Sequence, residues 1–246
     1  MDSDNTMWFY TKGAIYKYSN KIWEKIDTSI ISGAYHINTD ALGEVLFASD
    51  KGLTIFKDGK WETLNTNKIK ELPSNRVYFA HRDKAGRLWI GTFSGSIMID
   101  KNKSVTAYNN SSTPLKNVCI TGAAEDENGN LYLSLFAYDN KSGQRDIDDE
   151  GMAVLAKDGK WLHYNDKNSG LPANSINSLF YDKSEKVLWI GSHYAGLVRF
   201  DLKDSWENYN NENSRVPSGD IYQITQDAVG SLYISTYNGL LKMSKK

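Results

Sequence analysis

A repeated pattern constrains the fold of this chain more than any other feature. A glycine that follows a short turn recurs six times in 246 residues, at Gly13, Gly52, Gly95, Gly151, Gly196 and Gly239. Subtraction along the sequence gives successive spacings of 39, 43, 56, 45 and 43 residues, so only the third repeat is long. A period of about 40–45 residues is typical of the blades of a β-propeller.

Each repeat divides into four short strands. The two clearest copies run from Leu72 to Asp100 and from Leu171 to Asp201, with apolar and polar residues alternating within the strands and no helical stretch between them. We therefore predict an all-β fold, a six-bladed β-propeller of four-stranded repeats that forms a single domain over residues 1-246. The expected repeats are approximately 1-30, 31-65, 66-109, 110-165, 166-210 and 211-246.

The first turn of a repeat carries an Asp, usually followed three residues later by a Gly. These pairs are Asp40/Gly43, Asp83/Gly86, Asp126/Gly129 and Asp227/Gly230. An Asp side chain caps its own turn and Gly accepts a positive φ, so the pair predicts a turn without a ligand. The segment EDENGN, from Glu125 to Asn130, superficially resembles a calcium loop, but it lacks the distal bidentate Glu, and we interpret it as the same turn.

Large aromatic residues recur once per repeat in two of the strands. The second strand has Trp8, Trp89, Tyr132, Trp189 and Tyr233, and the fourth has Trp23, Trp61, Trp161 and Trp206. Aromatic side chains of this size, spaced once per repeat, are expected to pack between neighbouring sheets. We predict in particular that Trp89 and Trp189 are buried between blades.

The repeat resembles a known family. Its LP(S/A)N opening, LWIG(T/S) strand, GL..F strand and W..Y strand are similar to the two-component regulator propeller repeat over nearly the whole chain. That repeat occurs in tandem in the sensor regions of bacterial hybrid histidine kinases. The resemblance implies a non-enzymatic sensor propeller in the periplasm or cell envelope, with a glycan or other oligosaccharide as the candidate ligand.

The first and last repeats are shorter than the others. Asp2 to Trp8 aligns with Asp83 to Trp89, so the first repeat lacks its first strand, and the sequence after Leu240 to Met243 contains no Trp strand. We expect the first and last blades to be short by one strand each. Natural proteins normally cover or pair a free sheet edge, so a processed chain or a partner is expected at this seam.

No catalytic or cofactor motif is found in the sequence. The four histidines, His36, His81, His163 and His193, show no metal-ligand spacing, and His36 and His81 are interpreted as hydrogen-bonded residues of inner strands. We expect no cofactor, no metal and no enzymatic activity. Two alternatives stay open, a protein–protein interaction scaffold and, as some propellers are enzymes, a propeller lyase or glycan-active enzyme.

Composition excludes two classes of partner. The net charge of -1 gives no electrostatic footprint for nucleic acid, and no apolar run is long enough to span a membrane. The single cysteine, Cys119, is expected to be a small buried hydrophobe. The insert of the third repeat carries acids from Asp146 to Glu150 with no regular spacing, and we expect a surface loop without a tightly bound metal.

The candidate ligand site lies at the turns between second and third strands. Four of these turns carry aromatic residues, and in a closed ring they emerge on the same face as the segments that lead into the first strands. Aromatic rings beside amide and charged groups favour a platform for a sugar or a peptide. The predicted site residues are Phe93, Tyr138, His193, Tyr194, Tyr237, Asn75, Arg76, Asn174 and Asp220.

Overall fold

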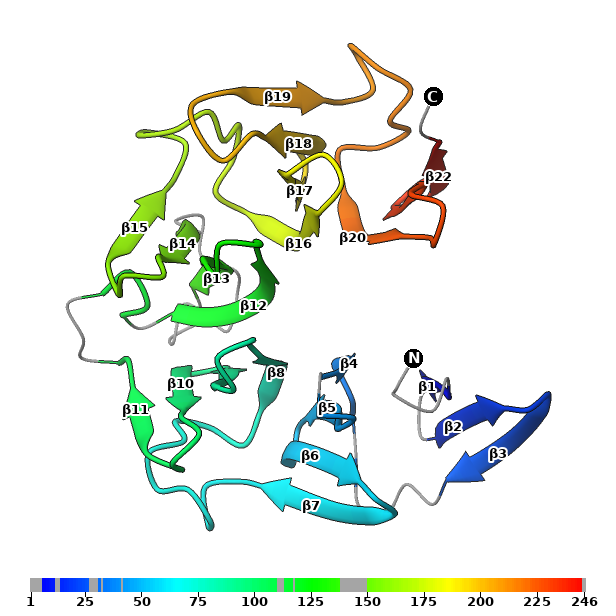
Figure 1. Cartoon of the computed structure of the whole chain (residues 1–246), viewed down its shortest axis with the longest axis vertical. Helices are drawn as coiled ribbons and strands as arrows, with labels where there is room; N and C mark the ends of the chain where they lie inside the picture. The colour runs from blue at the N-terminus through cyan, green and yellow to red at the C-terminus, as the bar shows by residue number, and fades with distance from the viewer. Residues whose placement is uncertain are drawn as a thin grey trace. The chain divides into compact units, whose positions relative to one another are not determined.

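The computed structural model describes residues 6–11, 14–26, 31, 33–40, 42–109, 113–116, 118–137 and 150–244. These residues form 22 strands in six antiparallel sheets and no helix (Figure 1). The sheets are the expected blades, so the prediction of a six-bladed β-propeller is confirmed. Among the described residues the first and last blades have three strands each, also as predicted.

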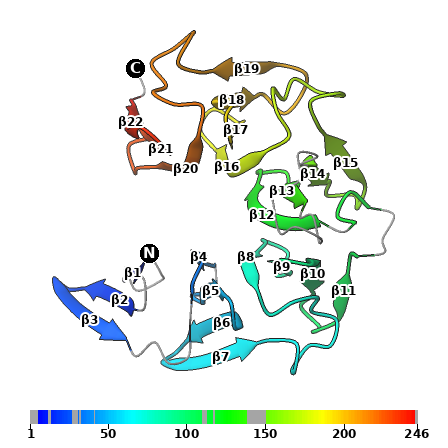
Figure 2. The ribbon, with the colours of Figure 1, turned by 180° about the vertical axis from the view of Figure 1, so that it is seen from behind.

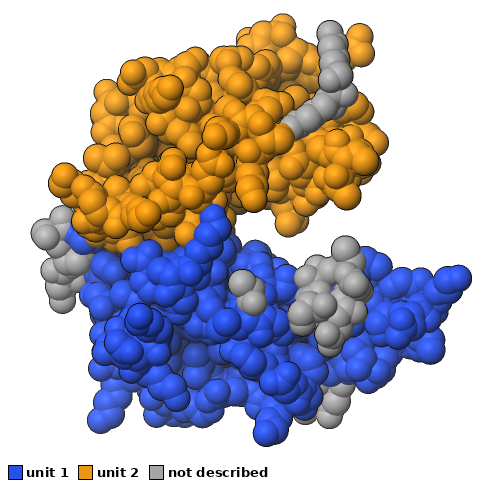
Figure 3. Space-filling model, viewed as in Figure 1, with its two compact units in different colours: residues 1–120 blue, residues 121–246 orange. Residues whose placement is uncertain are grey.

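The chain divides into two compact units, residues 1–120 and 121–246, which Figure 3 colours separately. Unit 1 holds blades 1 to 3. Blade 1 consists of β1 (Met7–Thr11), β2 (Ala14–Ser19) and β3 (Ile22–Ile26). Blade 2 consists of β4 (His36–Thr39), β5 (Val45–Ser49), β6 (Gly52–Lys57) and β7 (Lys60–Leu64). Blade 3 consists of β8 (Val77–Arg82), β9 (Leu88–Thr92), β10 (Gly95–Ile99) and β11 (Val105–Ala107).

Unit 2 holds blades 5 and 6 and nearly all of blade 4, whose first strand begins just before the boundary. Blade 4 consists of β12 (Val118–Glu125), β13 (Leu131–Ala137), β14 (Gly151–Leu155) and β15 (Trp161–Tyr164). Blade 5 consists of β16 (Ile176–Asp182), β17 (Val187–Ser192), β18 (Leu197–Phe200) and β19 (Trp206–Tyr209). Blade 6 consists of β20 (Ile221–Gln226), β21 (Leu232–Thr236) and β22 (Gly239–Met243).

The core of each unit lies between neighbouring blades. Within unit 2, Trp189 of blade 5 packs in one cluster with Ile221 and Ile234 of blade 6. The inner strands β16 and β20 lie side by side in both views of the ribbon, as do β4 and β8 of unit 1 (Figures 1 and 2). Trp89 is 0% exposed and Trp189 is 3% exposed, which confirms that both are buried.

The Asp turns form as the sequence predicts. The backbone N–H of Arg87 donates to Oδ1 of Asp83 at 2.9 Å, and the indole N–H of Trp89 donates to Oδ2 at 2.8 Å. The same arrangement recurs at Asp126, whose Oδ1 accepts the backbone N–H groups of Asn128 and Asn130 at 2.9 Å each. EDENGN is therefore a self-capped turn, in which the Asp accepts the donors of its own loop.

The aromatic residues of the fourth strands do not all pack alike. Trp61 joins the cluster between blades 1 and 2, and Trp206 joins that between blades 4 and 5. Trp23 differs, because 59% of it is exposed, and its ring contacts only Phe9 and Tyr18 of its own blade among the described aromatic residues. The expectation that every fourth-strand Trp packs between sheets is therefore wrong for Trp23.

Burial favours the uncharged forms of two groups in unit 1, the Cys119 thiol and the His36 imidazole. Cys119 is buried, as expected, and its burial raises the thiol pKa. Burial lowers the pKa of His36 to about 4, with His81 nearby contributing. The interpretation of these histidines as hydrogen-bonded is only partly right, because Nδ1 of His36 and Nε2 of His81 have no hydrogen-bond partner among the described residues.

Candidate functional site

In blades 3, 5 and 6, one edge joins two kinds of segment, the turn between second and third strands and the lead-in segment before the first strand. Backbone hydrogen bonds connect them: the N–H of Phe93 donates to the carbonyl of Arg76, that of His193 to Ser175 and that of Tyr237 to Asp220, at 2.9, 2.8 and 3.1 Å. We call this part of a blade its turn edge. The predicted site residues belong to these edges because the repeat fixes where the turns form.

The turn edges of blades 5 and 6 meet at Asp220. Nδ1 of His193 lies 2.6 Å from Oδ1 of Asp220, and the backbone N–H of Tyr194 donates to the same oxygen at 3.0 Å. The His193 and Tyr194 ring centroids are 3.5 Å apart. Asp220 therefore holds the blade 5 turn through its side chain and the blade 6 turn, at Tyr237, through its carbonyl.

Tyr194 has a backbone conformation that bulky residues rarely adopt. Its φ is +73°, in the left-handed region, and 76% of the residue is exposed. The turn from Ser192 to Gly196 is one residue longer than the turn from Thr92 to Gly95, and Tyr194 is within the longer one. Strain of this kind is held only where surrounding contacts enforce it, and it concentrates at functional sites.

A close approach between two backbone segments holds Tyr194 in this conformation. The N–H of Gly196 donates to the carbonyl of Gly219 at 2.8 Å, which draws the blade 5 turn onto the lead-in segment of blade 6. A Cβ at Gly219 would lie 2.3 Å from the carbonyl oxygen of Tyr194. Position 219 therefore requires glycine. On blade 6, Tyr237 is 72% exposed, and the amide of Asn238 donates to the carbonyl of Pro217 at 3.0 Å.

The turn edges of unit 1 carry a different cluster. The Arg76 guanidinium lies 5.2 Å from the centre of the Phe93 ring, which is half-buried, and Arg76 Nε lies 3.3 Å from Oδ1 of Asp50. The hydroxyl of Tyr35 donates to the same oxygen at 2.7 Å, and the Tyr35 ring stands 4.7 Å from that of Tyr78. Burial and Asp50 together raise the pKa of Tyr35 to about 12.

Three members of this cluster, Tyr35, Asp50 and Tyr78, are missing from the predicted set. Asp50 occupies the same place in its turn as Phe93 and His193, so alignment of the turns by position would have found it. Because the prediction was based on aromatic residues in these turns, it did not include Asp50. Tyr35 and Tyr78 come from the lead-in segment and first strand of neighbouring blades, and no sequence spacing connects them.

Two of the predicted amides have a structural role. The Oδ1 atoms of Asn75 and Asn174 accept the backbone N–H groups of Thr66 and Asp166 at 2.8 Å each, within the links that join successive blades. Phe136, the aromatic residue two positions before Tyr138, lies inside β13 and is buried. Tyr138 and the acids from Asp146 to Asp149 lie outside the described residues.

The predicted site residues are therefore distributed over both units. His193, Tyr194, Asp220 and Tyr237 are brought together in unit 2. Phe93, Asn75 and Arg76 belong to unit 1. A single site that includes both groups stays a prediction.

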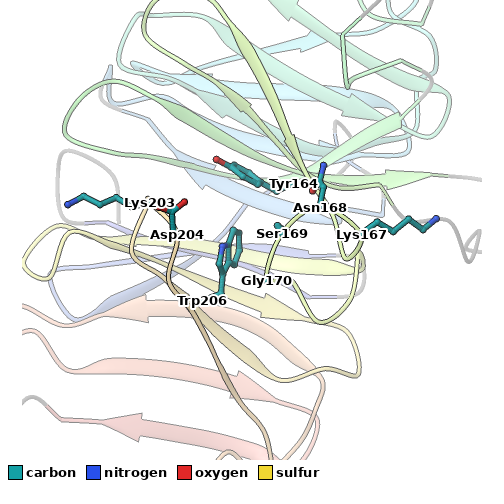
Figure 4. Close-up of a pocket in the computed structure, with 8 residues that line it drawn as sticks. All are labelled: Tyr164, Lys167, Asn168, Ser169, Gly170, Lys203, Asp204 and Trp206. Carbon is teal, nitrogen blue, oxygen red and sulfur yellow. The ribbon is translucent and has the colours of Figure 1, made fainter.

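Unit 2 also has a pocket that the sequence reasoning missed. Its volume is about 650 Å³, and it is lined by Tyr164, Lys167, Asn168, Ser169, Gly170, Lys203, Asp204 and Trp206 (Figure 4). Trp206 stacks on Phe200 with ring centroids 3.8 Å apart, and a Cβ at Gly170 would lie 2.4 Å from the Trp206 side chain. The indole is thus packed by its own unit, and the pocket offers less free aromatic surface than the turn edges.

The fold and the turn edges together define a class, a β-propeller with exposed aromatic and charged groups at its blade turns. Residues 71–94 match the family described as the two-component regulator propeller, which confirms the resemblance seen in the repeat. No curated protein matches the sequence significantly.

Three solved structures illustrate the range of similar propellers. The extracellular domain of a hybrid two-component system from B. thetaiotaomicron is 19% identical, with a TM-score of 0.65 over 100% of this chain and 38% of that one. A streptogramin B lyase is 12% identical, with a TM-score of 0.66 over 99% and 80%. A gluconolactonase from Xanthomonas campestris is 14% identical, with a TM-score of 0.59 over 98% and 82%.

The chain spans about two fifths of the length of the two-component system domain that it resembles. At these identities the likeness concerns the fold, which sensors and enzymes share. In the described part of the chain no helix is long and apolar enough to cross a membrane. Nor do three or more His, Cys, Asp or Glu residues gather there as a metal site.

Proposed function

We propose that this chain is a non-enzymatic ligand-recognition propeller, similar to the sensor modules of two-component systems, and that it binds an oligosaccharide at the turn edges of blades 5 and 6. The observation that carries the proposal is Tyr194, an exposed aromatic residue held at a φ of +73° by Asp220. A strained and exposed aromatic residue has no role in the core, so a role in binding accounts for the strain.

The chemistry of this cluster suits a ligand with apolar faces and hydroxyl groups. Tyr194 and Tyr237 are 76% and 72% exposed and offer rings for stacking. Nδ1 of His193 lies 2.6 Å from Oδ1 of Asp220 but is not in hydrogen-bonding geometry with it, and Nε2 would exchange a hydrogen bond with a ligand hydroxyl. Stacking would supply affinity, and the imidazole and carboxylate would supply orientation.

A sensor role places the chain outside the cytoplasm. The two-component system structure that it resembles is an extracellular domain, and the family match at residues 71–94 agrees with that context. We propose a periplasmic or cell-envelope location on this basis. The chain would act as the recognition part of a signalling system.

The test is a thermal-shift screen with oligosaccharides, followed by titration of any stabilising compound against Phe93→Ala, Tyr194→Ala and Tyr237→Ala. A ligand that binds only the folded state raises the Tm of the protein, so a compound that binds is recognised by the increase in Tm. We expect Tyr194→Ala and Tyr237→Ala to weaken binding by about tenfold or more, in the range found for stacked aromatic anchors. Loss with Phe93→Ala as well would support a site that includes both units.

Tyr222→Ala is the matched control, because Tyr222 is also an exposed aromatic residue of blade 6 but lies on β20. Equal affinity of all three variants and the parent would refute the site. A chain that ignores every oligosaccharide but binds a protein would favour the scaffold alternative. Consumption of the ligand would favour an enzyme, as in the lyase and gluconolactonase that share the fold.

A further inference from the structure

The pocket of unit 2 lies between two segments that the proposed function does not use. One is the link that leads into blade 5, with Tyr164 at the end of β15, and the other is the turn from β18 to β19, with Trp206 at the start of β19. Its volume of about 650 Å³ is in the range of small-molecule sites. The pocket is therefore large enough to hold a ligand of its own.

Glycine at position 170 leaves the link side of the pocket without a side chain. A Cβ there would lie 2.4 Å from the Cβ of Trp206. The equivalent residues, each directly before a buried Leu or Val, are Glu71 in the link of blade 3 and Arg215 in that of blade 6. Both have long side chains at the place that Gly170 leaves empty.

Hydrogen bonds within each wall fix the shape of the pocket. In the link, the hydroxyl of Ser169 donates to the carbonyl of Asn165 at 2.6 Å. In the turn, Oδ1 of Asp201 accepts the backbone N–H groups of Lys203 and Ser205 at 2.9 and 3.0 Å. Because both walls are held by their own contacts, a ligand has little backbone to order when it binds.

Three charged side chains of the pocket are left for a ligand. Lys167, Lys203 and Asp204 are exposed, and none of them forms an ion pair within the described ranges, whereas Lys160 of the same unit pairs with a carboxylate at 3.0 Å. In Figure 4, Lys203 and Asp204 lie on one side of Trp206 and Lys167 lies on the other. Two cations and one carboxylate give the pocket a net positive charge, which favours an anionic ligand.

The groups between the lysines suit a hydroxylated ring. Tyr164 and Trp206 are half-buried, with ring centroids 5.6 Å apart and an angle of 63° between the rings. Burial raises the pKa of Tyr164, and the nearby carboxylate of Asp204 adds to the increase. An ionised carboxylate only accepts hydrogen bonds, so Asp204 requires a donor, and the hydroxyl groups of a sugar supply several.

A solvated gap between two blades is the simpler interpretation of the pocket. Packing of Trp206 would by itself account for the glycine at position 170. It does not account for Lys167 and Lys203, because two cations without a carboxylate partner are not needed to close a gap. The charge pattern is therefore the observation that favours a ligand over a gap.

We propose that this pocket binds a small sugar that carries a phosphate or carboxylate group. The anionic group pairs with Lys203 and Lys167, the sugar hydroxyls donate to Asp204, and the ring lies against the edges of Tyr164 and Trp206. Both lysines have flexible stems, so their ammonium groups can turn towards one ligand. The site shares no residue with the turn edges of blades 5 and 6 and does not depend on the function proposed for them.

The first experiment is calorimetric titration of the full chain with hexose 6-phosphates and hexuronates, which distinguishes the two anionic groups. Glucose and inorganic phosphate are the controls, because each has only half of the recognised chemistry. We expect one class of anionic sugar to bind at least about tenfold more tightly than either control, as the loss of one charged hydrogen bond implies. Added salt should weaken this binding, because the lysines are exposed. Equal affinity for inorganic phosphate, or no binding of any anionic sugar, would overturn the proposal.

Charge reversal then locates the bound sugar. Lys203→Glu and Lys167→Glu should each lower affinity by about fivefold, the effect of one exposed ion pair. Lys183→Glu is the matched control, since Lys183 is an exposed lysine of blade 5 that does not line the pocket. Its affinity should equal that of the parent, as should that of Tyr194→Ala, which alters only the turn edge. Full affinity in both pocket variants, or loss of binding in Tyr194→Ala, would overturn the proposal.

Discussion

The turn edges of the two units form the same contact between neighbouring blades, but the carboxylate stands on opposite sides of it. In unit 1 the turn of blade 2 supplies Asp50 and the lead-in segment of blade 3 supplies Arg76. In unit 2 the turn of blade 5 supplies His193 and the lead-in segment of blade 6 supplies Asp220. The residues occupy equivalent places in the repeat, but the carboxylate has moved from the turn to the lead-in segment.

This exchange changes what the junction exposes. In unit 1 the Arg76 side chain covers Phe93, and Asp50 is shared with the hydroxyl of Tyr35. In unit 2 the longer turn lifts Tyr194 into solvent, and Asp220 accepts its backbone N–H. The repeat therefore determines where a site forms. The residue at the place of Arg76 and the length of the turn determine whether an aromatic residue there is covered or exposed.

The largest expected effect concerns Trp89 and Trp189, one in each unit. Truncation of either to Ala should lower the free energy of unfolding by roughly 3–5 kcal/mol, because each is a fully packed indole. The measurement is chemical unfolding together with calorimetry. A single-domain chain predicts that both variants shift one common transition, and two separate transitions would contradict that prediction. A loss below about 1 kcal/mol for both would show that they do not anchor the blades.

Replacement by Phe sharpens the same comparison. The Trp89 indole donates to Asp83, whereas the indole nitrogen of Trp189 has no hydrogen-bond partner in the described part of the chain. Trp89→Phe should therefore cost about 1–2 kcal/mol more than Trp189→Phe, because it removes a donor from a buried carboxylate. Equal losses of stability would mean that the hydrogen bond from the Trp89 indole to Asp83 adds nothing measurable to the packing of the ring.

Acid should weaken unit 1 through His36. Its pKa falls from 6.5 to about 4 on folding, so the folded state binds fewer protons than the unfolded state between these values. The stabilisation is complete above pH 6.5 and is lost as the pH falls towards 4, by roughly 3 kcal/mol at most. His81, whose pKa burial also lowers, faces Asp40, Asp83 and Lys84 and acts in the same direction.

Urea unfolding between pH 7.5 and pH 4.5 measures this slope. His36→Gln should flatten it, because a neutral amide has no proton to gain. Phe79→Leu is the control, since the Phe79 ring packs 4.7 Å from that of His36 and does not titrate. That control should lower stability equally at all pH values. An unchanged slope in His36→Gln would assign the acid sensitivity to other groups.

The two charged junctions should differ in their contribution to stability. The side chains of His193 and Asp220 are 22% and 18% exposed, whereas those of Arg76 and Asp50 are 50% and 42% exposed. Asp220→Ala should cost about 1–2 kcal/mol, because it also frees the backbone N–H of Tyr194. Asp50→Ala should cost less than about 1 kcal/mol, as exposed pairs usually do. The reverse order in urea unfolding would break the comparison.

The smallest expected effect is at Tyr194 itself. Tyr194→Gly should raise the free energy of unfolding by about 0.5–1 kcal/mol, because glycine adopts a positive φ without steric cost. Ligand affinity should fall at the same time, because the variant lacks the exposed ring that would stack on the ligand. The control is Ser94→Gly in the shorter turn, because Ser94 is not among the residues with a positive φ. A clear loss of stability in Tyr194→Gly would show that contact with the His193 ring outweighs the strain.

The sequence by itself determined the blades. Marker glycines, Asp turns and alternating strands are local signals, since a turn needs a positive φ or a capping oxygen wherever it occurs. Burial of Trp89, Trp189 and Cys119 followed from the same pattern. A blade strand is covered on both faces by neighbouring sheets, so an apolar side chain on it is expected to be buried. The three strands that the structure describes in blade 6 were also expected, from a repeat without a Trp strand.

Only the tertiary structure decided which residues of the turn edges meet. Asp220 holds Tyr194 from 26 residues away, and Arg76 lies beside Asp50 from a neighbouring blade, so no spacing within one repeat reveals either contact. The same limit explains the exposure of Trp23, and it explains why Nδ1 of His36 and Nε2 of His81 lack a hydrogen-bond partner within the described ranges. A side chain's solvation depends on the neighbouring blade, and the repeat pattern specifies only the blade to which the residue belongs.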